Sequence, residues 1–275
     1  MKIQYGVMQG RLSPLVGKKI QAFPEKYWAK EFVEIKKTGL NIIEWTLDYK
    51  NLKENPLISL EGQKKIKLLS KKHSIKINSV TCDCFMQKPF WKIKNNKKIL
   101  SYLKQIIFAS GKLNIKFIII PLVDNGSIEN LLQEKNLILI CKHYEKYLIK
   151  NNVSIIFESD YKAKRLLKLI KKLNFKYFGI NYDVGNSASL NYNINEEFLI
   201  YGKFIKNIHI KDRAKFGATV KLGEGNVDFK KLFKNLKKTN YKGNLILQTA
   251  RSKNNKHAEE IVANLNYIKK FNNEN

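Results

Sequence analysis

Eight short apolar runs rich in β-branched residues alternate with longer amphipathic segments along the chain. The runs cover residues 3–8, 41–47, 75–83, 116–123, 153–160, 178–185, 205–212 and 244–251. Near-continuous hydrophobicity is typical of strands that are covered on both faces, as in a parallel sheet. The alternation therefore predicts eight parallel strands, each followed by a helix.

The segments between the runs are predicted to be helices. They cover residues 25–38, 60–73, 97–113, 128–150, 163–173, 196–203, 229–239 and 258–271. In the first of them, Trp28, Phe32 and Ile35 recur at spacings of four and three, which places them on one helix face. Gly39 directly after this segment is a helix stop signal.

Eight strand–helix units without a linker rich in Pro, Gly or Ser predict a single α/β domain over residues 1–275, a closed (β/α)8 TIM barrel. A length of 275 residues is normal for such a barrel. A doubly wound open sheet is the alternative, but it normally carries a Gly-rich phosphate loop after its first strand. Residues 9–12, Gln-Gly-Arg-Leu, lack that pattern.

The net charge of +29 raises the question of nucleic-acid binding, because Lys and Arg neutralise phosphates. The basic residues are mostly lysines spread over every predicted helix, and they form no single stripe. Ile, Asn and Lys are abundant together, as AT-rich codons would produce. We therefore expect a generic solvated surface that attracts small acidic substrates, and we do not expect a nucleic-acid partner.

Neither a membrane span nor a disulfide framework is expected. Residues 117–123 are the most apolar stretch, yet they are too few to cross a bilayer, and residues 1–10 lack the apolar run of a secretory signal. An odd number of cysteines argues against a disulfide framework and favours reduced thiols in the cytoplasm. They are Cys82, Cys84 and Cys141.

Polar residues follow the predicted strands at their C-terminal ends, where TIM barrels gather their functional residues. These positions bring carboxylates, one imidazole and several cations to one rim of the barrel. The residues are Arg11, Glu44, Asp83, Asp124, Glu158, Asp160, Asp183, His209, Lys211, Asp212, Gln248 and Arg251.

Three of these residues fall on successive strands, the fifth, sixth and seventh: Glu158, Asp183 and His209. Taken singly, each is more often a helix cap, a surface residue or a satisfied core histidine than a ligand. Neighbouring strands lie about 4.8 Å apart, so three such groups at matching depth can share one cation. Two carboxylates and one imidazole suit Mn²⁺, Mg²⁺, Co²⁺ or Zn²⁺, and Gln248 on the eighth strand can add a neutral oxygen.

Seven motifs spread over the chain resemble the xylose isomerase-like TIM-barrel superfamily, in particular its sugar phosphate isomerase/epimerase branch. The motifs are GVMQGRLSP at 6–14, IEW at 43–45, PLVDN at 121–125, YDVGN at 182–186, IHIKDR at 208–213, LGEGNVDF at 222–229 and LQTAR at 247–251.

The resemblance implies a metal site and a reaction. Ketose epimerases of this superfamily hold a divalent ion with Glu, Asp, His and a second Glu, and these positions correspond to Glu158, Asp183, His209 and Gln248. Gln248 departs from the pattern, because an amide cannot titrate, and this argues against a symmetrical two-base epimerase. A one-base isomerisation or an elimination is compatible with it. Asn186 stands where the epimerases use a His.

We accordingly expect an isomerase or epimerase that converts a sugar or sugar phosphate through a cis-enediolate. Glu158 is the predicted base and Lys211 the predicted donor of the returning proton. Further substrate contacts are expected from Glu44 and Asn186, and from three arginines that either grip a phosphate or carboxylate or pair with rim carboxylates. The arginines are Arg11, Arg213 and Arg251.

Two other functions stay open at this point. Abasic-site DNA endonucleases of the same superfamily hold three zinc ions with many strand-end histidines, whereas only one of the four histidines here lies at the end of a predicted strand. A non-catalytic carbohydrate-binding barrel would have lost the chemistry through Gln248. Assembly into homo-oligomers is compatible with each of these functions.

Overall fold

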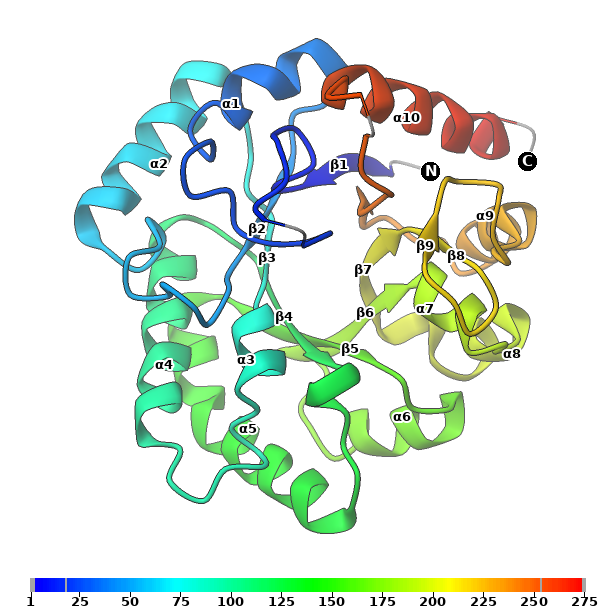
Figure 1. Ribbon diagram of the computed structural model, residues 1–275. Helices are drawn as coiled ribbons and strands as arrows, with labels where there is room; N and C mark the ends of the chain where they lie inside the picture. Colours follow the sequence, from blue (N-terminus) through cyan, green and yellow to red (C-terminus); the bar gives the residue numbers. More distant parts are fainter. Residues whose placement is uncertain (1–2, 18, 253, 274–275) are drawn as a thin grey trace. The chain divides into compact units, whose positions relative to one another are not determined.

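The computed structural model describes residues 3–17, 19–252 and 254–273. Within these ranges, eight parallel strands close into a barrel in the order β1-β10-β7-β6-β5-β4-β3-β2 (Figure 1), which confirms the predicted barrel. The strands are β1 Gln4–Met8, β2 Ile43–Thr46, β3 Ser79–Thr81, β4 Phe117–Leu122, β5 Ser154–Ser159, β6 Phe178–Asp183, β7 Ile205–Ile210 and β10 Asn244–Leu247.

Seven of the predicted helices have a counterpart within about three residues at each end. The α-helices are α1 Glu31–Glu34, α2 Leu60–His73, α3 Asp83–Gln87, α4 Lys97–Lys112, α5 Leu131–Asn151, α6 Ala163–Ile170, α7 Val184–Ser189, α8 Ile194–Tyr201, α9 Phe229–Lys238 and α10 His257–Asn273. Short 3-10 helices are η1 Ile35–Thr38, η2 Asp124–Gly126 and η3 Gly202–Phe204. Among the described residues, no helix is long and apolar enough to cross a bilayer.

The helix predicted over residues 25–38 is wrong in its first half. Residues 25–30 form successive turns, in which the N–H groups of Tyr27 and Trp28 both donate to the carbonyl of Pro24. Regular helix is confined to α1, and η1 then ends at Gly39 with a left-handed φ of 72°. The predicted end of the helix at Gly39 is therefore confirmed, whereas its predicted start at residue 25 is wrong.

Three short elements directly after strands were not predicted. They are α3, α7 and a hairpin formed by β8 Asp212–Arg213 and β9 Thr219–Val220. Each is too short to show a helical or strand period in the sequence. The strands predicted from the sequence include only the first residues of these elements, which are Asp83, Val184, Gly185 and Asp212.

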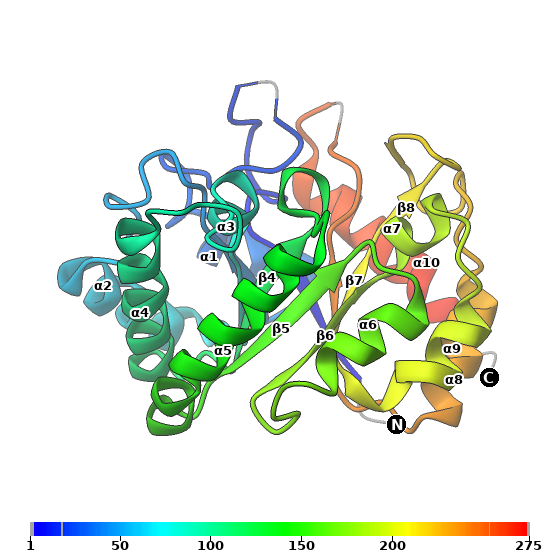
Figure 2. The same ribbon diagram turned by 90° about the horizontal axis from the view of Figure 1, so that it is seen from below.

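Contacts divide the chain into two compact units, Met1–Ile43 with Asn181–Asn275, and Glu44–Ile180. In the first unit β10 pairs with both β1 and β7. Helices α8 and α9 lie side by side (Figure 2), and α10 packs on α9 and η1. The rings of Phe229, Tyr267 and Phe271 fill the α9–α10 contact at centroid distances of 5.4 to 5.9 Å.

In the second unit β4 lies between β3 and β5, and its ladder with β5 runs over six residue pairs. Helices α4 and α5 pack against each other. The rings of Phe85, Phe90 and Trp91 are buried and stack edge to face at 5.3 and 4.9 Å. These three aromatics therefore pack against one another in the segment that follows β3.

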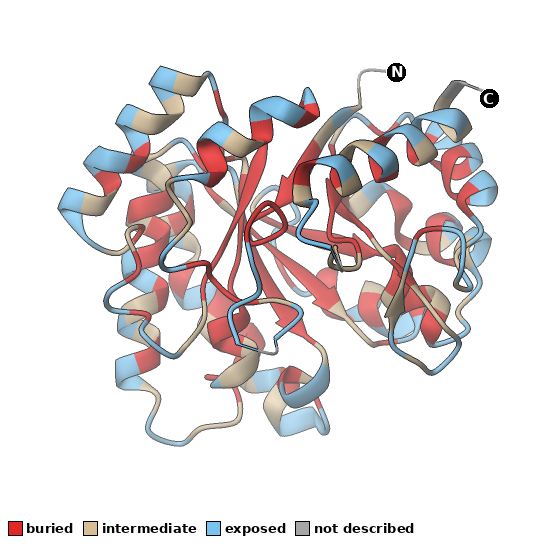
Figure 3. Cartoon of the chain, turned by 45° about the horizontal axis from the view of Figure 1, so that its top comes forward, coloured by how far each residue is buried: buried red, intermediate tan, exposed pale blue. Residues whose placement is uncertain are grey.

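The strands and helices are buried as the sequence pattern predicts, with strands covered on both faces and helices on one. The strands are almost wholly buried, whereas the helices bury one face and expose the other (Figure 3). Helix α4 shows this arrangement, with Ile99, Leu103 and Ile106 buried and the lysines Lys97, Lys98 and Lys104 exposed. The cysteines Cys82, Cys84 and Cys141 are buried free thiols.

Two loops that follow strands are each held by a buried carboxylate. Glu31 of α1 accepts the backbone N–H groups of Gly10 and Leu12 at 3.0 and 3.1 Å, in the loop after β1. Asp212, the first residue of β8, accepts hydrogen bonds at 2.9 to 3.1 Å from the backbone N–H groups of four residues that follow it. They are Arg213, Gly223, Gly225 and Val227.

The Glu31 carboxyl is expected to make stability depend on pH. Burial raises its pKa from 4.5 to about 7, although the hydrogen bonds from Gly10 and Leu12 act in the opposite direction. Between these values the folded protein keeps a proton that the unfolded chain has released, so the free energy of unfolding falls as the pH rises. The fall is roughly 3 kcal/mol if the whole shift is expressed. Urea unfolding of Glu31→Gln should show a flatter pH dependence between about pH 4.5 and 7; the wild-type slope in this variant would contradict the assignment.

The loop held by Asp212 leaves no room for a side chain at residue 225. A Cβ atom at Gly225 would overlap the Asp212 carboxylate and the Arg213 carbonyl. Gly225→Ala should therefore lower the free energy of unfolding by about 1–3 kcal/mol in urea titrations. Lys221→Ala, an exposed change in the same loop, should stay within about 0.5 kcal/mol of wild type. Equal stability of Gly225→Ala and Lys221→Ala would show that the loop yields freely.

Candidate metal centre at the strand ends

Successive side chains of β6 point to opposite faces, so Asp183 points to the barrel interior and its neighbour Tyr182 points outward. The Tyr182 hydroxyl donates to Glu197 of α8 at 2.8 Å, and its ring packs edge to face on Phe198. Burial together with the neighbouring Glu197 carboxylate raises the pKa of Tyr182 well above its usual value. This outer anchor fixes the strand that carries Asp183.

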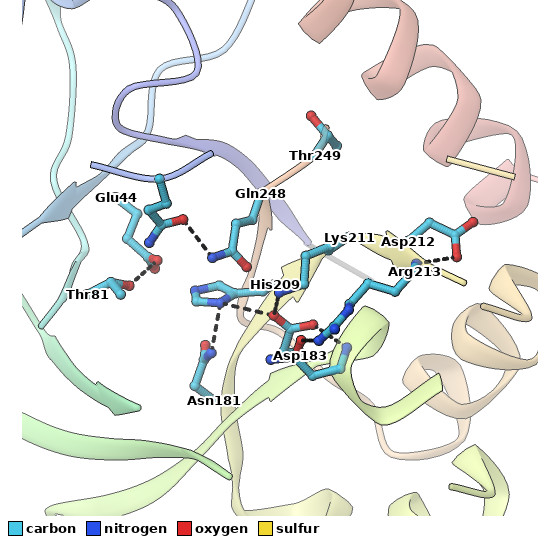
Figure 4. A network of polar contacts seen from close by, with 12 residues as sticks. Glu44, Thr81, Asn181, Asp183, His209, Lys211, Asp212, Arg213, Gln248 and Thr249 are labelled. Carbon is cyan, nitrogen blue, oxygen red and sulfur yellow. Dashed lines mark hydrogen bonds and ion pairs between the residues drawn. The ribbon is translucent and has the colours of Figure 1, made fainter. Parts of the chain in front are cut away.

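Asp183 combines three contacts on one buried carboxylate (Figure 4). Its Oδ1 accepts the backbone N–H of Asn186 at 2.8 Å and so caps α7. Its Oδ2 lies 2.7 Å from Lys211 Nζ and 3.9 Å from His209 Nδ1. Sequence reasoning placed these residues at one rim, and the structure brings Asp183, His209 and Lys211 into contact within one unit.

Glu158 completes a group that can hold a cation. Glu158, Asp183 and His209 each offer one ligand atom, and these atoms lie within 4.8 Å of one another. All three residues are buried. Ligand atoms about 2.0–2.2 Å from a common divalent ion can meet this spacing after small side-chain movements. The predicted Glu/Asp/His set therefore exists as a spatial group.

Gln248 follows β10, two positions beyond Ile246, which pairs with His209. Its Nε2 donates to Gln21 at 2.8 Å. Its Oε1 is buried and, among the described residues, has no hydrogen-bond partner. An orphaned buried carbonyl oxygen is the kind of atom that a cation or a substrate hydroxyl would satisfy.

The guanidinium groups of the three predicted arginines donate hydrogen bonds to backbone carbonyls. Arg11 donates to Thr249 at 2.8 Å and to Ile20 at 3.1 Å, while Arg251 donates to Gly10 and Ser13. Arg213 donates to the Gly217 carbonyl from two nitrogens and to Asn186 Oδ1 at 2.8 Å. These bonds stabilise the loops after β1, β7 and β10. The contacts of the three arginines with substrate stay predictions.

Glu44 on β2 is fully buried and held by two hydroxyl groups. Ser79 and Thr81 of β3 donate to its two oxygens at 2.5 and 2.7 Å. The carboxylate is therefore fixed in one orientation. Its predicted contact with substrate stays a prediction.

Three buried asparagines next to the site were missed by sequence reasoning. They are Asn181 on β6, Asn207 on β7 and Asn244 on β10. A signal was present: Asn181 and Asn207 stand two residues before Asp183 and His209, so they point to the same interior side of otherwise apolar strands.

The comparisons with known proteins agree with this fold. A family model described as xylose isomerase-like TIM barrel matches residues 32–271. Over 97 residues, 33% of the chain, the sequence is 34% identical to a Haemophilus influenzae protein whose name provisionally assigns it as an L-ribulose-5-phosphate 3-epimerase. That match spans about a third (34%) of the relative's own length.

Solved structures similar in fold cover nearly the whole chain. The 3-keto-D-glucoside 4-epimerase of E. coli has a TM-score of 0.72 at 16% identity, over 98% of this chain and 100% of that one. A xylose isomerase-like TIM barrel protein from Mycobacterium smegmatis, solved in complex with magnesium, has a TM-score of 0.70 at 13% identity, over 97% of both chains. Because the family model covers most of the sequence, the chain belongs to the xylose isomerase-like TIM barrel family.

Proposed function

We propose that this single-domain barrel is a metal-dependent isomerase or epimerase of a sugar or sugar phosphate. The observation that carries the proposal is the grouping of Glu158, Asp183 and His209 within 4.8 Å at the strand ends. Sugar epimerases among the proteins of similar sequence and fold support the substrate class. The buried free thiols are compatible with a reducing, cytoplasmic setting.

The residues present fit one divalent ion. Two carboxylates and an imidazole form the donor set, and the buried Oε1 of Gln248 can supply a neutral oxygen. Mn²⁺, Mg²⁺, Co²⁺ and Zn²⁺ all accept such donors, and a neighbour in fold was solved with magnesium. When bound, the ion would polarise the carbonyl of a hydroxy-ketone or aldose as a Lewis acid.

Glu158 is the proposed base. Its carboxylate would remove a proton from the carbon beside the substrate carbonyl, and the electron pair left behind would move onto the carbonyl oxygen to give a cis-enediolate. Return of a proton to the other carbon gives an isomer, whereas return on the opposite face gives an epimer. Lys211 Nζ, 2.7 Å from Asp183, is the proposed donor of that proton.

Recognition of the substrate would fall to side chains on the loops around the site. Arg11, Arg213 and Arg251 already organise these loops through carbonyl contacts, and we propose that their guanidinium groups also attract a substrate phosphate or carboxylate. Glu44 and Asn186 are the proposed partners of sugar hydroxyls. A homo-oligomer is compatible with this arrangement.

The described histidines do not favour the DNA-repair alternative. His73 ends α2, His143 lies within α5 and His257 begins α10, so they are not strand-end ligands. Only His209 among them joins the carboxylate group. A three-zinc site rich in histidine would need more imidazoles at the rim.

Glu158→Gln should abolish deuterium exchange from solvent into the substrate carbon, because an amide cannot accept the proton. We expect the turnover of a ketose phosphate panel to fall by about 10²–10⁴-fold, with the fold intact by circular dichroism. Glu134→Gln is the matched control, since Glu134 on α5 is equally buried but pairs with Tyr161 and Lys172, which flank α6. Exchange at the wild-type rate in Glu158→Gln would remove Glu158 from the base role.

Gln248→Glu should tighten Mn²⁺ binding by about tenfold or more in calorimetric titrations, because a carboxylate replaces a neutral oxygen in the donor set. The change would also supply a second titratable group and so favour epimerisation over isomerisation. Gln63→Glu, at a buried amide of α2, is the control for a general effect of added charge. Equal Mn²⁺ affinity of wild type and Gln248→Glu would exclude residue 248 from the donor set.

A further inference from the structure

A chain of three buried amides ends on the His209 ring. Asn244 Nδ2 donates to Asn207 Oδ1 at 3.3 Å, and Asn207 Nδ2 donates to Asn181 Oδ1 at 2.8 Å. Asn181 Nδ2 then lies 3.1 Å from His209 Nδ1. Figure 4 marks this contact with a dashed line. The asparagines are 5%, 0% and 1% exposed, so the chain is shielded from solvent.

The direction of these bonds selects one form of the imidazole. Asn181 presents an NH₂ group to Nδ1, and an NH₂ group can only donate. Nδ1 must therefore carry the lone pair, and the proton of the neutral ring must lie on Nε2. The same Nδ1 lies 3.9 Å from Asp183 Oδ2, so this lone pair is on the side of the proposed donor set.

We propose that Asn181 is a positioning residue that holds His209 in the tautomer with an unprotonated Nδ1, and that Asn207 and Asn244 fix the orientation of the Asn181 amide. The role deepens the proposed function, on which it rests, because a cation requires an unprotonated ring nitrogen. Histidine ligands usually have their tautomer set through the other ring nitrogen. Here the Asn181 amide instead donates to His209 Nδ1, which is itself the proposed ligand nitrogen. The amide must therefore move away when a cation binds the lone pair of Nδ1.

A neutral amide suits this task better than a carboxylate. A carboxylate within hydrogen-bond distance of Nδ1, closer than the 3.9 Å at which Asp183 Oδ2 lies, can only accept a hydrogen bond, so it would draw the imidazole proton onto Nδ1. An amide oriented by Asn207 keeps that nitrogen unprotonated and adds no charge to the barrel interior. The near-isosteric change Asn181→Asp should therefore reverse the tautomer.

The test is two-bond ¹H–¹⁵N correlation spectroscopy of the metal-free protein with ¹⁵N-labelled histidines, at a pH where the imidazole is neutral. His209 is assigned by the signals that disappear in His209→Gln. Wild type should show His209 with the unprotonated-type shift at Nδ1 and the protonated type at Nε2. Asn181→Asp should exchange the two shifts, and Asn207→Leu should give a mixture, since Asn181 Oδ1 then loses the donor that orients the amide.

Asn235→Leu is the matched control, because Asn235 is a buried amide of α9 that bonds to Asn195 and does not join this chain. Its His209 signals should match those of wild type. A wild-type Nδ1 that carries the proton, or unchanged signals in both Asn181→Asp and Asn207→Leu, would overturn the inference. If Asn181→Asp does not fold, wild type and Asn207→Leu decide. Since neither metal nor substrate is added, a failure of the proposed sugar chemistry would leave this result unaffected.

Discussion

A buried carboxylate must find partners for all its lone pairs, and the site depends on how Asp183 meets this requirement. One oxygen accepts the first free N–H of α7, and the other faces Lys211 and His209. A negative charge with so little exposure would be costly without these contacts. The same group thus starts a helix, holds a cationic side chain and lies beside an imidazole, so local structure and the chemistry of the site are set together.

Glu31 and Asp212 apply the same solution to the loops that follow β1 and β7. Each is buried, and each gathers backbone N–H groups that no helix or strand would satisfy. The glycines of the 222–228 loop follow from this, because Gly225 must approach the Asp212 carboxylate closely. Rigid loops around a strand-end site favour a fixed geometry of the side chains that they carry.

The proposed chemistry is best supported where local and tertiary signals agree. Strand-end carboxylates and one imidazole were visible in the sequence, and their ligand atoms form one group in the fold. Gln248 is the point where the chain differs from the two-glutamate pattern, and its buried Oε1 would supply the proposed donor set with an oxygen that carries no titratable proton. A barrel with one base and a neutral oxygen favours proton transfer by a single carboxylate.

The sequence by itself determined the barrel and the chemical type of the site, because strand and helix periods are local and strand ends of a parallel barrel meet at one rim. It did not show α3, α7 or the β8–β9 hairpin, which are too short for a period. Only the tertiary structure decided the partners of Arg11 and of the asparagine chain. Arg11 bonds to a carbonyl 238 positions away, and Asn181 receives its bond from another strand. Such pairings depend on which groups folding brings together, and no local pattern encodes that proximity.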